Sequence, residues 1–142
     1  MTSGLFPTFS GPTILTDNWT LTLPDTYECR SENGLLTFWR DDLAIWVNAF
    51  GTEDGTTIAE RMTRDRNSAG PEATNLTEST ENGIGRLSYE LSETRPDGMC
   101  VNSLYTYTHT PKAQVMIAFY YQDKDVVSRA RAIYETLAYT GG

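Results

Sequence analysis

Apolar and polar side chains alternate along much of this chain, and turn-forming residues interrupt the alternation at short intervals. Between Trp19 and Leu23, one Trp and two Leu alternate with two Thr, which is the period expected of a half-buried strand. Pro24 follows, and we expect it to end that strand because it cannot donate a backbone hydrogen bond. The pattern predicts short antiparallel strands.

The turn residues divide the remaining strand-like segments into two meanders. Asn33-Gly34 and Asn82-Gly83 favour two-residue turns, since both positions accept a positive φ angle. The first meander is predicted at about 26–32, 35–40 and 43–50, with Asp41-Asp42 as its second turn. The second is predicted at about 73–81, 84–93, 99–108 and 113–121, with connections at Pro96-Asp97-Gly98 and Thr110-Pro111. This gives about seven to eight strands.

Two segments have helical rather than strand periodicity. Thr57 and Glu60 form a capping-box pattern, which predicts a short helix from residue 57 to about residue 66. A second, amphipathic helix is predicted from Asp125 to about Tyr139, with Asp123 or Asp125 as its N-cap and Gly141 at its C-cap. Its apolar stripe comprises Val126, Val127, Ala130, Ile133, Tyr134 and Leu137.

These elements predict an α+β fold in a single domain spanning residues 1–142. The antiparallel sheet needs cover for its apolar surface, and the short helix and the C-terminal amphipathic helix can supply it. Residues 1–12 contain two Pro, two Gly and two Phe, which favours an irregular N-terminal arm. The length of 142 residues fits one domain of ordinary size.

The predicted strand pairing leaves one aromatic face as the first candidate binding surface. On it we place Tyr105, Tyr107, Met116 and Tyr120, with Val101, beside Arg86, Ser88 and Glu90. The opposite face, predicted to be the core, carries Leu87, Tyr89, Leu91, Leu104, Val115, Ile117 and Phe119. Such a mixture of aromatic, Met and polar side chains is typical of protein interfaces. The alternative is that the tyrosines pack under the short helix or the N-terminal arm.

A second candidate surface comes from the first meander. A two-residue turn at Asp41-Asp42 places Leu36, Phe38, Ile45 and Val47 on one side and Leu35, Trp39, Trp46 and Phe50 on the other. Because both sides are apolar, the favoured interpretation is a strand pair buried on both faces. The alternative is that Trp39 and Trp46 are presented to a partner.

The formal charge of −8 argues against nucleic acid and anionic membranes as partners, because both bind through Lys and Arg. The acidity favours either a monomer kept apart by self-repulsion or attraction toward a basic protein. The N-terminus lacks a basic, apolar leader and no apolar run is long enough to span a membrane. We therefore expect a cytoplasmic protein without membrane insertion.

Residues that could support catalysis or bind a metal are scarce. His109 is the single histidine, and we interpret it as a solvated turn residue rather than a catalytic base. Cys29 and Cys100 are interpreted as two reduced core thiols. Arg61, Arg64 and Arg66 are interpreted as a helix surface with ordinary ion pairs. The prediction is a non-enzymatic protein without metal or cofactor.

A family resemblance rests on three stretches of sequence. They are Trp19-Thr-Leu-Thr-Leu-Pro24, the run from Gly85 through Tyr89-Glu-Leu91 to Gly98 and Val101, and Ile117-Ala-Phe119 followed by Asp125 and Ile133 to Leu137. In these the chain resembles the PsbP-like fold and its bacterial DcrB-type domains, which include the Eag chaperones of type VI secretion effectors. That resemblance implies an accessory domain that holds another protein.

The favoured hypothesis is a bacterial-type protein-binding domain that sequesters or neutralises a partner, as an immunity protein or a secretion-effector chaperone does. The partner is expected to be basic or to expose apolar segments, and a homodimer is compatible with the sequence. The competing hypothesis is a small-ligand carrier or hydrolase with a pocket between the sheet and the C-terminal helix. A third is a purely structural subunit.

Overall fold

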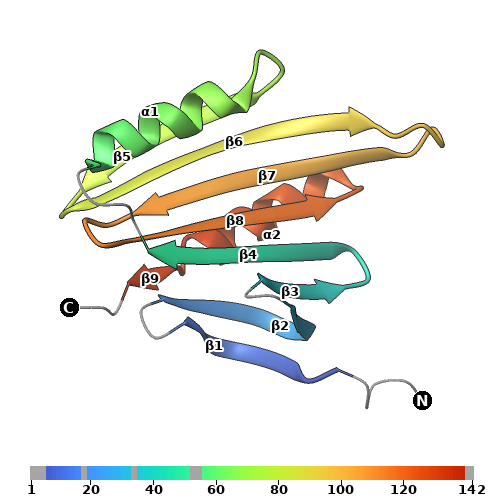
Figure 1. Cartoon of the computed structure of the whole chain (residues 1–142). Coiled ribbons are helices and arrows are strands. Elements are labelled where there is room, and N and C mark those ends of the chain that lie inside the picture. The colour runs from blue at the N-terminus through green and yellow to red at the C-terminus, as the bar shows by residue number, and fades with distance from the viewer. Residues whose placement is uncertain (1–5, 17–18, 33–34, 52–55, 140–142) are drawn as a thin grey trace.

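The computed structural model describes residues 6–16, 19–32, 35–51 and 56–139. Within these residues the chain forms one nine-stranded antiparallel sheet with a helix on each side (Figure 1). This confirms the predicted α+β class. The two predicted meanders are not separate sheets, because the last strand of the first pairs with the last strand of the second.

The sheet is built from two consecutive runs of strands. The first run is β1 (Thr8–Thr16), β2 (Trp19–Glu32), β3 (Leu35–Arg40) and β4 (Leu43–Gly51), and the second is β5 (Thr74–Glu81), β6 (Ile84–Thr94), β7 (Cys100–His109) and β8 (Ala113–Tyr121). The spatial order is β1-β2-β3-β4-β8-β7-β6-β5. The pairing of β4 with β8, in which Trp46 lies opposite Ala118, joins the two halves.

Helix α1 (Ile58–Ala69) begins at the predicted capping box. The Thr57 hydroxyl accepts a hydrogen bond from the Glu60 amide at 3.1 Å, and the Glu60 carboxylate accepts one from the Thr57 amide at 3.0 Å. Two otherwise unpaired amides at the helix end are thereby satisfied. The helix crosses the β6–β7 side of the sheet (Figure 1) and packs on both strands.

The C-terminal helix is shorter than the sequence pattern predicts. Asp123 caps a 3-10 turn, η2 (Lys124–Val126), and helix α2 then runs over Val127–Tyr134. The predicted extension to Tyr139 is wrong, because Ala138–Tyr139 forms a short strand, β9, that pairs with the start of β2. The Trp19 and Tyr139 rings lie 4.9 Å apart, so tertiary pairing outweighs local helical preference here. Gly141 lies outside the described residues.

Two predictions near the N-terminus are also wrong. Residues 8–12, predicted as part of an irregular arm, belong to strand β1, which pairs with β2. Pro24 does not end a strand, since β2 continues to Glu32. A register shift lies opposite it, between Phe9 and Gly11, so no ladder hydrogen bond is required of the proline nitrogen. The predicted Asn33-Gly34 turn lies outside the described residues.

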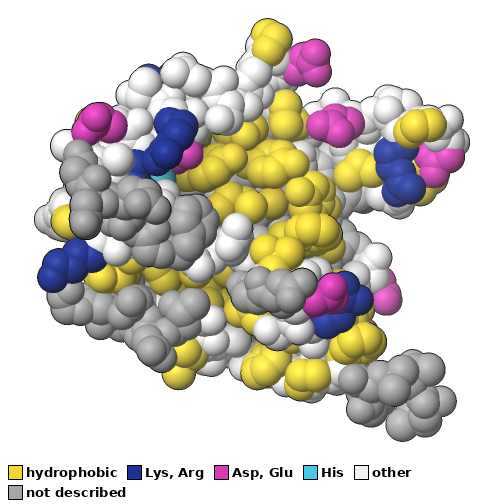
Figure 2. Space-filling model, in the orientation of Figure 1, with side chains coloured by type: hydrophobic (Ala, Val, Ile, Leu, Met, Phe, Trp, Pro, Cys, Tyr) yellow, Lys and Arg dark blue, Asp and Glu magenta, His cyan; other side chains and the backbone are white. Residues whose placement is uncertain are grey.

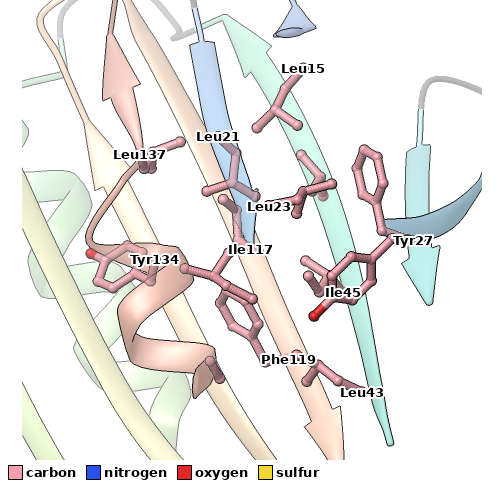
Figure 3. Close-up of a cluster of buried hydrophobic side chains, with 14 of the residues drawn as sticks. Leu15, Leu21, Leu23, Tyr27, Leu43, Ile45, Ile117, Phe119, Tyr134 and Leu137 are labelled. Carbon is pink, nitrogen blue, oxygen red and sulfur yellow. The ribbon is translucent and has the colours of Figure 1, made fainter. Parts of the chain in front are cut away.

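The main core lies between the sheet and α2 (Figure 3). Leu21, Ile45 and Ile117 are fully buried there against Ile133 and Leu137 of the C-terminal segment. A smaller apolar cluster lies on the other side, where Leu87 and Tyr89 pack under Met62 of α1. One helix therefore covers each side of the sheet, and α1 covers only part of its side (Figure 1).

The predicted registers of β3–β4 and β7–β8 are confirmed, and that of β6–β7 is wrong. Leu87 lies opposite Tyr107 and Tyr89 opposite Tyr105. Leu87 and Tyr89 therefore share a face with the two tyrosines of β7 and do not lie on the opposite face. Arg86, Ser88 and Glu90 consequently lie on the α2 side. The β6–β7 connection spans residues 95–99, between the pair Thr94 and Cys100, and a one-residue difference in loop length exchanges the two faces.

Candidate protein-binding face

The side of the sheet that carries α1 also carries all six residues predicted to bind a partner. We call this set the aromatic face: Trp39 of β3, Trp46 of β4, Tyr105 and Tyr107 of β7, and Met116 and Tyr120 of β8. The ladder pairs Tyr107 with Met116, and Tyr105 and Trp46 both with Ala118. The two candidate surfaces inferred from sequence are therefore one continuous surface.

Ring contacts connect most of the aromatic face. Trp46 meets Tyr120 edge to face with centroids 5.8 Å apart, and Tyr120 meets Tyr105 in the same way at 6.0 Å. Tyr105 in turn stacks on Tyr89 at 5.5 Å. The Tyr105 and Tyr120 hydroxyls are 3.1 Å apart. Such offset and edge-to-face pairs restrain the rings in one arrangement, so the surface is organised before any partner arrives.

Helix α1 covers the face unevenly. Tyr89 is buried beneath it and Tyr105 and Tyr107 are half-buried, so the alternative in which tyrosines pack under the short helix holds for this part. Beyond the helix, Trp46 is 42% exposed. Figure 2 shows hydrophobic surface extending away from α1 over the middle of the sheet. The favoured interpretation that both faces of the β3–β4 pair are buried is wrong for Trp46.

A groove of about 700 Å³ lies at the β2–β4 end of the aromatic face. Its lining combines aromatic and polar side chains: Phe6, Arg30, Glu32, Leu35, Thr37, Trp39, Trp46 and Asn48. Phe6 contacts Trp39 edge to face at 5.1 Å, and Arg30 pairs with Glu32 at 2.8 Å. The sequence analysis offered only the two tryptophans to a partner and placed Leu35 on the same side. The alternation that places Trp39 and Trp46 on this side also places Thr37 and Asn48 there.

Burial changes the acidity of the tyrosines on this face. It raises the pKa of Tyr107 and that of Tyr120 well above the usual value, and in each case a hydrogen bond to a neighbouring tyrosine adds to the rise. Both hydroxyls are protonated at neutral pH, as in any tyrosine, and the raised pKa keeps them so in alkaline solution. They can donate hydrogen bonds to a partner as well as accept them.

His109 is not a solvated turn residue, as the sequence suggested. It is 2% exposed, and its Nε2 lies 2.5 Å from the Asp65 carboxylate of α1. Arg61 lies 3.4 Å from Nδ1 of His109 and donates to the Thr110 carbonyl at 2.9 Å. Arg61 is also buried, so the prediction that it lies on the helix surface is wrong. This cluster fixes α1 to the sheet, and burial leaves it little access to a substrate.

The two cysteines occupy different environments. Cys29 is buried, and burial raises the pKa of its thiol, which lowers its reactivity at neutral pH. Cys100 is exposed, so its prediction as a core thiol is wrong. No group of three His, Cys, Asp or Glu side chains suited to a metal ion occurs among the described residues.

The competing prediction of a pocket beneath the C-terminal helix finds limited support. Ala130 and Ile133 of α2 are fully buried against the sheet. A groove of about 300 Å³ is lined by Lys124 and Val127 together with Tyr121 and mostly polar residues of β5–β7. Its lining offers few apolar contacts for a ligand.

Comparisons with known proteins give a fold and no family. No protein-family description matches the sequence, and no curated protein matches it significantly. A solved structure from Bacteroides thetaiotaomicron VPI-5482 is similar in fold, with a TM-score of 0.70 and 12% sequence identity. The match covers 94% of this chain and 50% of that chain. At this identity the likeness concerns the fold alone.

No helix in the described part of the chain is long and apolar enough to cross a membrane.

Proposed function

We propose that this protein is a non-enzymatic binding domain that sequesters or neutralises another protein through the aromatic face. The observation that carries the proposal is the position of Trp46, which is 42% exposed at the end of a connected series of aromatic rings. Exposed aromatic side chains in a restrained cluster are typical of the few residues that dominate binding energy at protein interfaces.

The chemistry of the face indicates what kind of partner would fit. Trp46, Met116 and Tyr120 offer an apolar surface, while the tyrosine hydroxyls provide hydrogen-bonding groups at its centre. The whole chain has a formal charge of −8, which accelerates encounter with a basic partner. An apolar segment with basic flanks meets both requirements. A toxin held by an immunity protein and a secretion effector held by a chaperone are the two settings we propose.

Binding can be tested with three variants that truncate the part of the face outside the apolar cluster under α1. Wild-type protein and the Trp46→Ala, Met116→Ala and Tyr120→Ala variants would be used to isolate binding proteins from the native host, followed by affinity measurements with each purified partner. We expect Trp46→Ala to weaken the complex by about 2 kcal/mol or more. Met99→Ala is the matched control, because Met99 is 43% exposed in the β6–β7 connection. Equal affinity of all four variants for every partner would refute this placement.

A further inference from the structure

The groove beside Trp46 has a regular chemical arrangement set by the sheet register. Across β2, β3 and β4, one row contains Arg30, Thr37 and Trp46, and the next contains Glu32, Leu35 and Asn48. All six line the same groove. An apolar wall therefore stands beside groups that can form hydrogen bonds and ion pairs, a combination that fixes the orientation of a ligand.

Several polar groups in the groove have unused bonding capacity. Thr37 and Asn48 have no side-chain hydrogen bond to any other described residue, and both are half-buried. Arg30 contacts one oxygen of the Glu32 carboxylate, Oε2, at 2.8 Å. A carboxylate accepts hydrogen bonds on both oxygens, so Glu32 can receive a second cation while it keeps Arg30.

The charged side chains on the α1 side of the sheet favour a cation as the ligand of the groove beside Trp46. The charged side chains that the register places on the α1 side of the sheet are Glu28, Arg30 and Glu32 of β2, Glu78 of β5 and Glu93 of β6. These are four acids and one base, and Glu78 is already paired with Arg66 of α1. Glu93 also influences Tyr120 electrostatically. A cation entering this groove from a partner would meet an acidic surrounding and the exposed indole of Trp46.

We propose that the groove binds a basic side chain, best an arginine, that lies within an apolar segment of the partner. The guanidinium stacks on Trp46 and donates to the free oxygen of Glu32, while Thr37 and Asn48 bind the adjacent peptide groups. This inference rests on the proposed protein-binding function and specifies the partner's chemistry. Arginine suits the site better than lysine, because its planar group both stacks on an aromatic ring and forms hydrogen bonds in the same plane.

The test uses defined peptides in place of the unidentified partner. Acetylated, amidated Gly-Leu-Xaa-Leu-Gly peptides with Arg, Lys, Gln or Glu as Xaa would be titrated into the isotope-labelled full chain. Amide and indole chemical shifts in NMR spectra report the site and the affinity. We expect the Arg peptide to shift the Trp46 indole and Asn48 side-chain signals, and to bind about threefold to tenfold more tightly than the Gln peptide.

Two variants separate the contributions of ring and charge. Glu32→Gln should remove most of the preference for Arg over Gln and weaken the dependence on salt, while Trp46→Ala should abolish the shifts. Glu81→Gln is the control for charge alone, because Glu81 is exposed at the β5–β6 turn. Equal binding of Arg, Gln and Glu peptides would overturn the proposal, as would shifts confined to other surfaces.

Failure of the basic-side-chain proposal can be distinguished from failure of the proposed protein-binding function. A partner that loses affinity with Tyr120→Ala and Met116→Ala but not with Glu32→Gln would support the aromatic face and refute the basic side chain. Loss with Glu32→Gln and Trp46→Ala would support both, provided that Glu32→Gln has no further effect once the partner's arginine has been changed to Gln.

Discussion

The guanidinium of Arg61 on helix α1 faces Nδ1 of His109 on strand β7 at 3.4 Å, and the two side chains are 1% and 2% exposed. Because arginine can only donate, Nδ1 must be the acceptor, and the proton of the neutral ring is on Nε2, where it meets Asp65. The burial of these groups depends on one another, and helix α1 is positioned by all three.

Removal of Arg61 should therefore be costly. Arg61→Ala leaves Nδ1 of His109 and the Thr110 carbonyl without their donor in a buried site, which should destabilise the protein by about 3 kcal/mol. Urea unfolding followed by circular dichroism would measure this. Arg64→Ala on the exposed side of the same helix is the control, and we expect its effect to be within about 0.5 kcal/mol of zero. Equal losses of stability in the two variants would show that the buried Arg61 contributes no more than the exposed Arg64.

Gly85 sets how closely α1 approaches the sheet. A Cβ at this position would lie 2.5 Å from Cγ2 of Ile58 and 2.5 Å from Sδ of Met62, so Gly85→Ala must push the helix side chains away. We expect a loss of about 1–3 kcal/mol in stability. The double variant Gly85→Ala with Met62→Ala should lose less than the sum of the single effects, since the second change makes room for the first. Additive effects would contradict this contact.

Stability should fall at alkaline pH because the buried tyrosines resist ionisation. Burial, followed by the nearby Glu90 charge, raises the pKa of Tyr121 to about 12, whereas an unfolded tyrosine ionises near about pH 10. The folded form therefore binds this proton more tightly. Its contribution is complete below about pH 10 and is lost as pH rises toward the folded value. Urea unfolding at a series of pH values would show the decline.

Tyr121→Phe provides the check on this assignment. Its hydroxyl has no hydrogen bond to another described residue, so Phe should fold normally and show a shallower alkaline decline than wild type. The remainder would come from the other tyrosines whose pKa values burial raises: Tyr27, Tyr89, Tyr107, Tyr120 and Tyr134. Identical pH profiles for wild type and Tyr121→Phe would count against a raised Tyr121 pKa.

The β3–β4 turn is tied to α2 by an ion pair that should be lost in acid. Asp42 accepts a hydrogen bond on Oδ1 from Nη1 of Arg129 at 2.9 Å, and its Oδ2 forms an ion pair with Nη2 at 2.9 Å. The hydrogen bond from Arg129 is the main cause that lowers the pKa of Asp42 below its usual value. Its contribution is present above about pH 4 and disappears as pH falls through the lowered value. Since both side chains are more than a third exposed, Asp42→Asn should cost no more than about 1 kcal/mol at neutral pH.

The matched control is Asp41→Asn in the same turn, because Asp41 has no ion-pair partner among the described residues. Asp42→Asn should flatten the decline in stability at acid pH, and Asp41→Asn should not. A difference of more than about 2 kcal/mol at neutral pH would show that solvent screens this pair less than its exposure implies.

Much of the sheet could be predicted where local chemistry determines the turn. Asn82 and Gly83 both adopt positive φ angles, as their residue types favour, and the strands on either side begin and end as expected. Asp41-Asp42 likewise set the β3–β4 register. The 95–99 connection was ambiguous by one residue, and that ambiguity misplaced Leu87 and Tyr89 relative to the tyrosines of β7.

The candidate face was predictable in composition and not in extent. Trp46 and Tyr120 come from separate meanders, and only the pairing of β4 with β8 brings their rings together. The burial of His109 depends on where α1 packs on the sheet. No local sequence pattern specifies that position. In both cases the information is in contacts between residues distant in sequence, which turn chemistry and periodicity do not specify.

The pairing of Trp19 with Tyr139 has a consequence for how the chain acquires its structure during synthesis. Strand β2 cannot complete its hydrogen bonds until residues 138 and 139 have left the ribosome. The N-terminal strands therefore keep apolar surface uncovered until nearly all of the described chain has been translated. Ribosome-bound fragments that stop before residue 138 should bind chaperones more readily than fragments that include it.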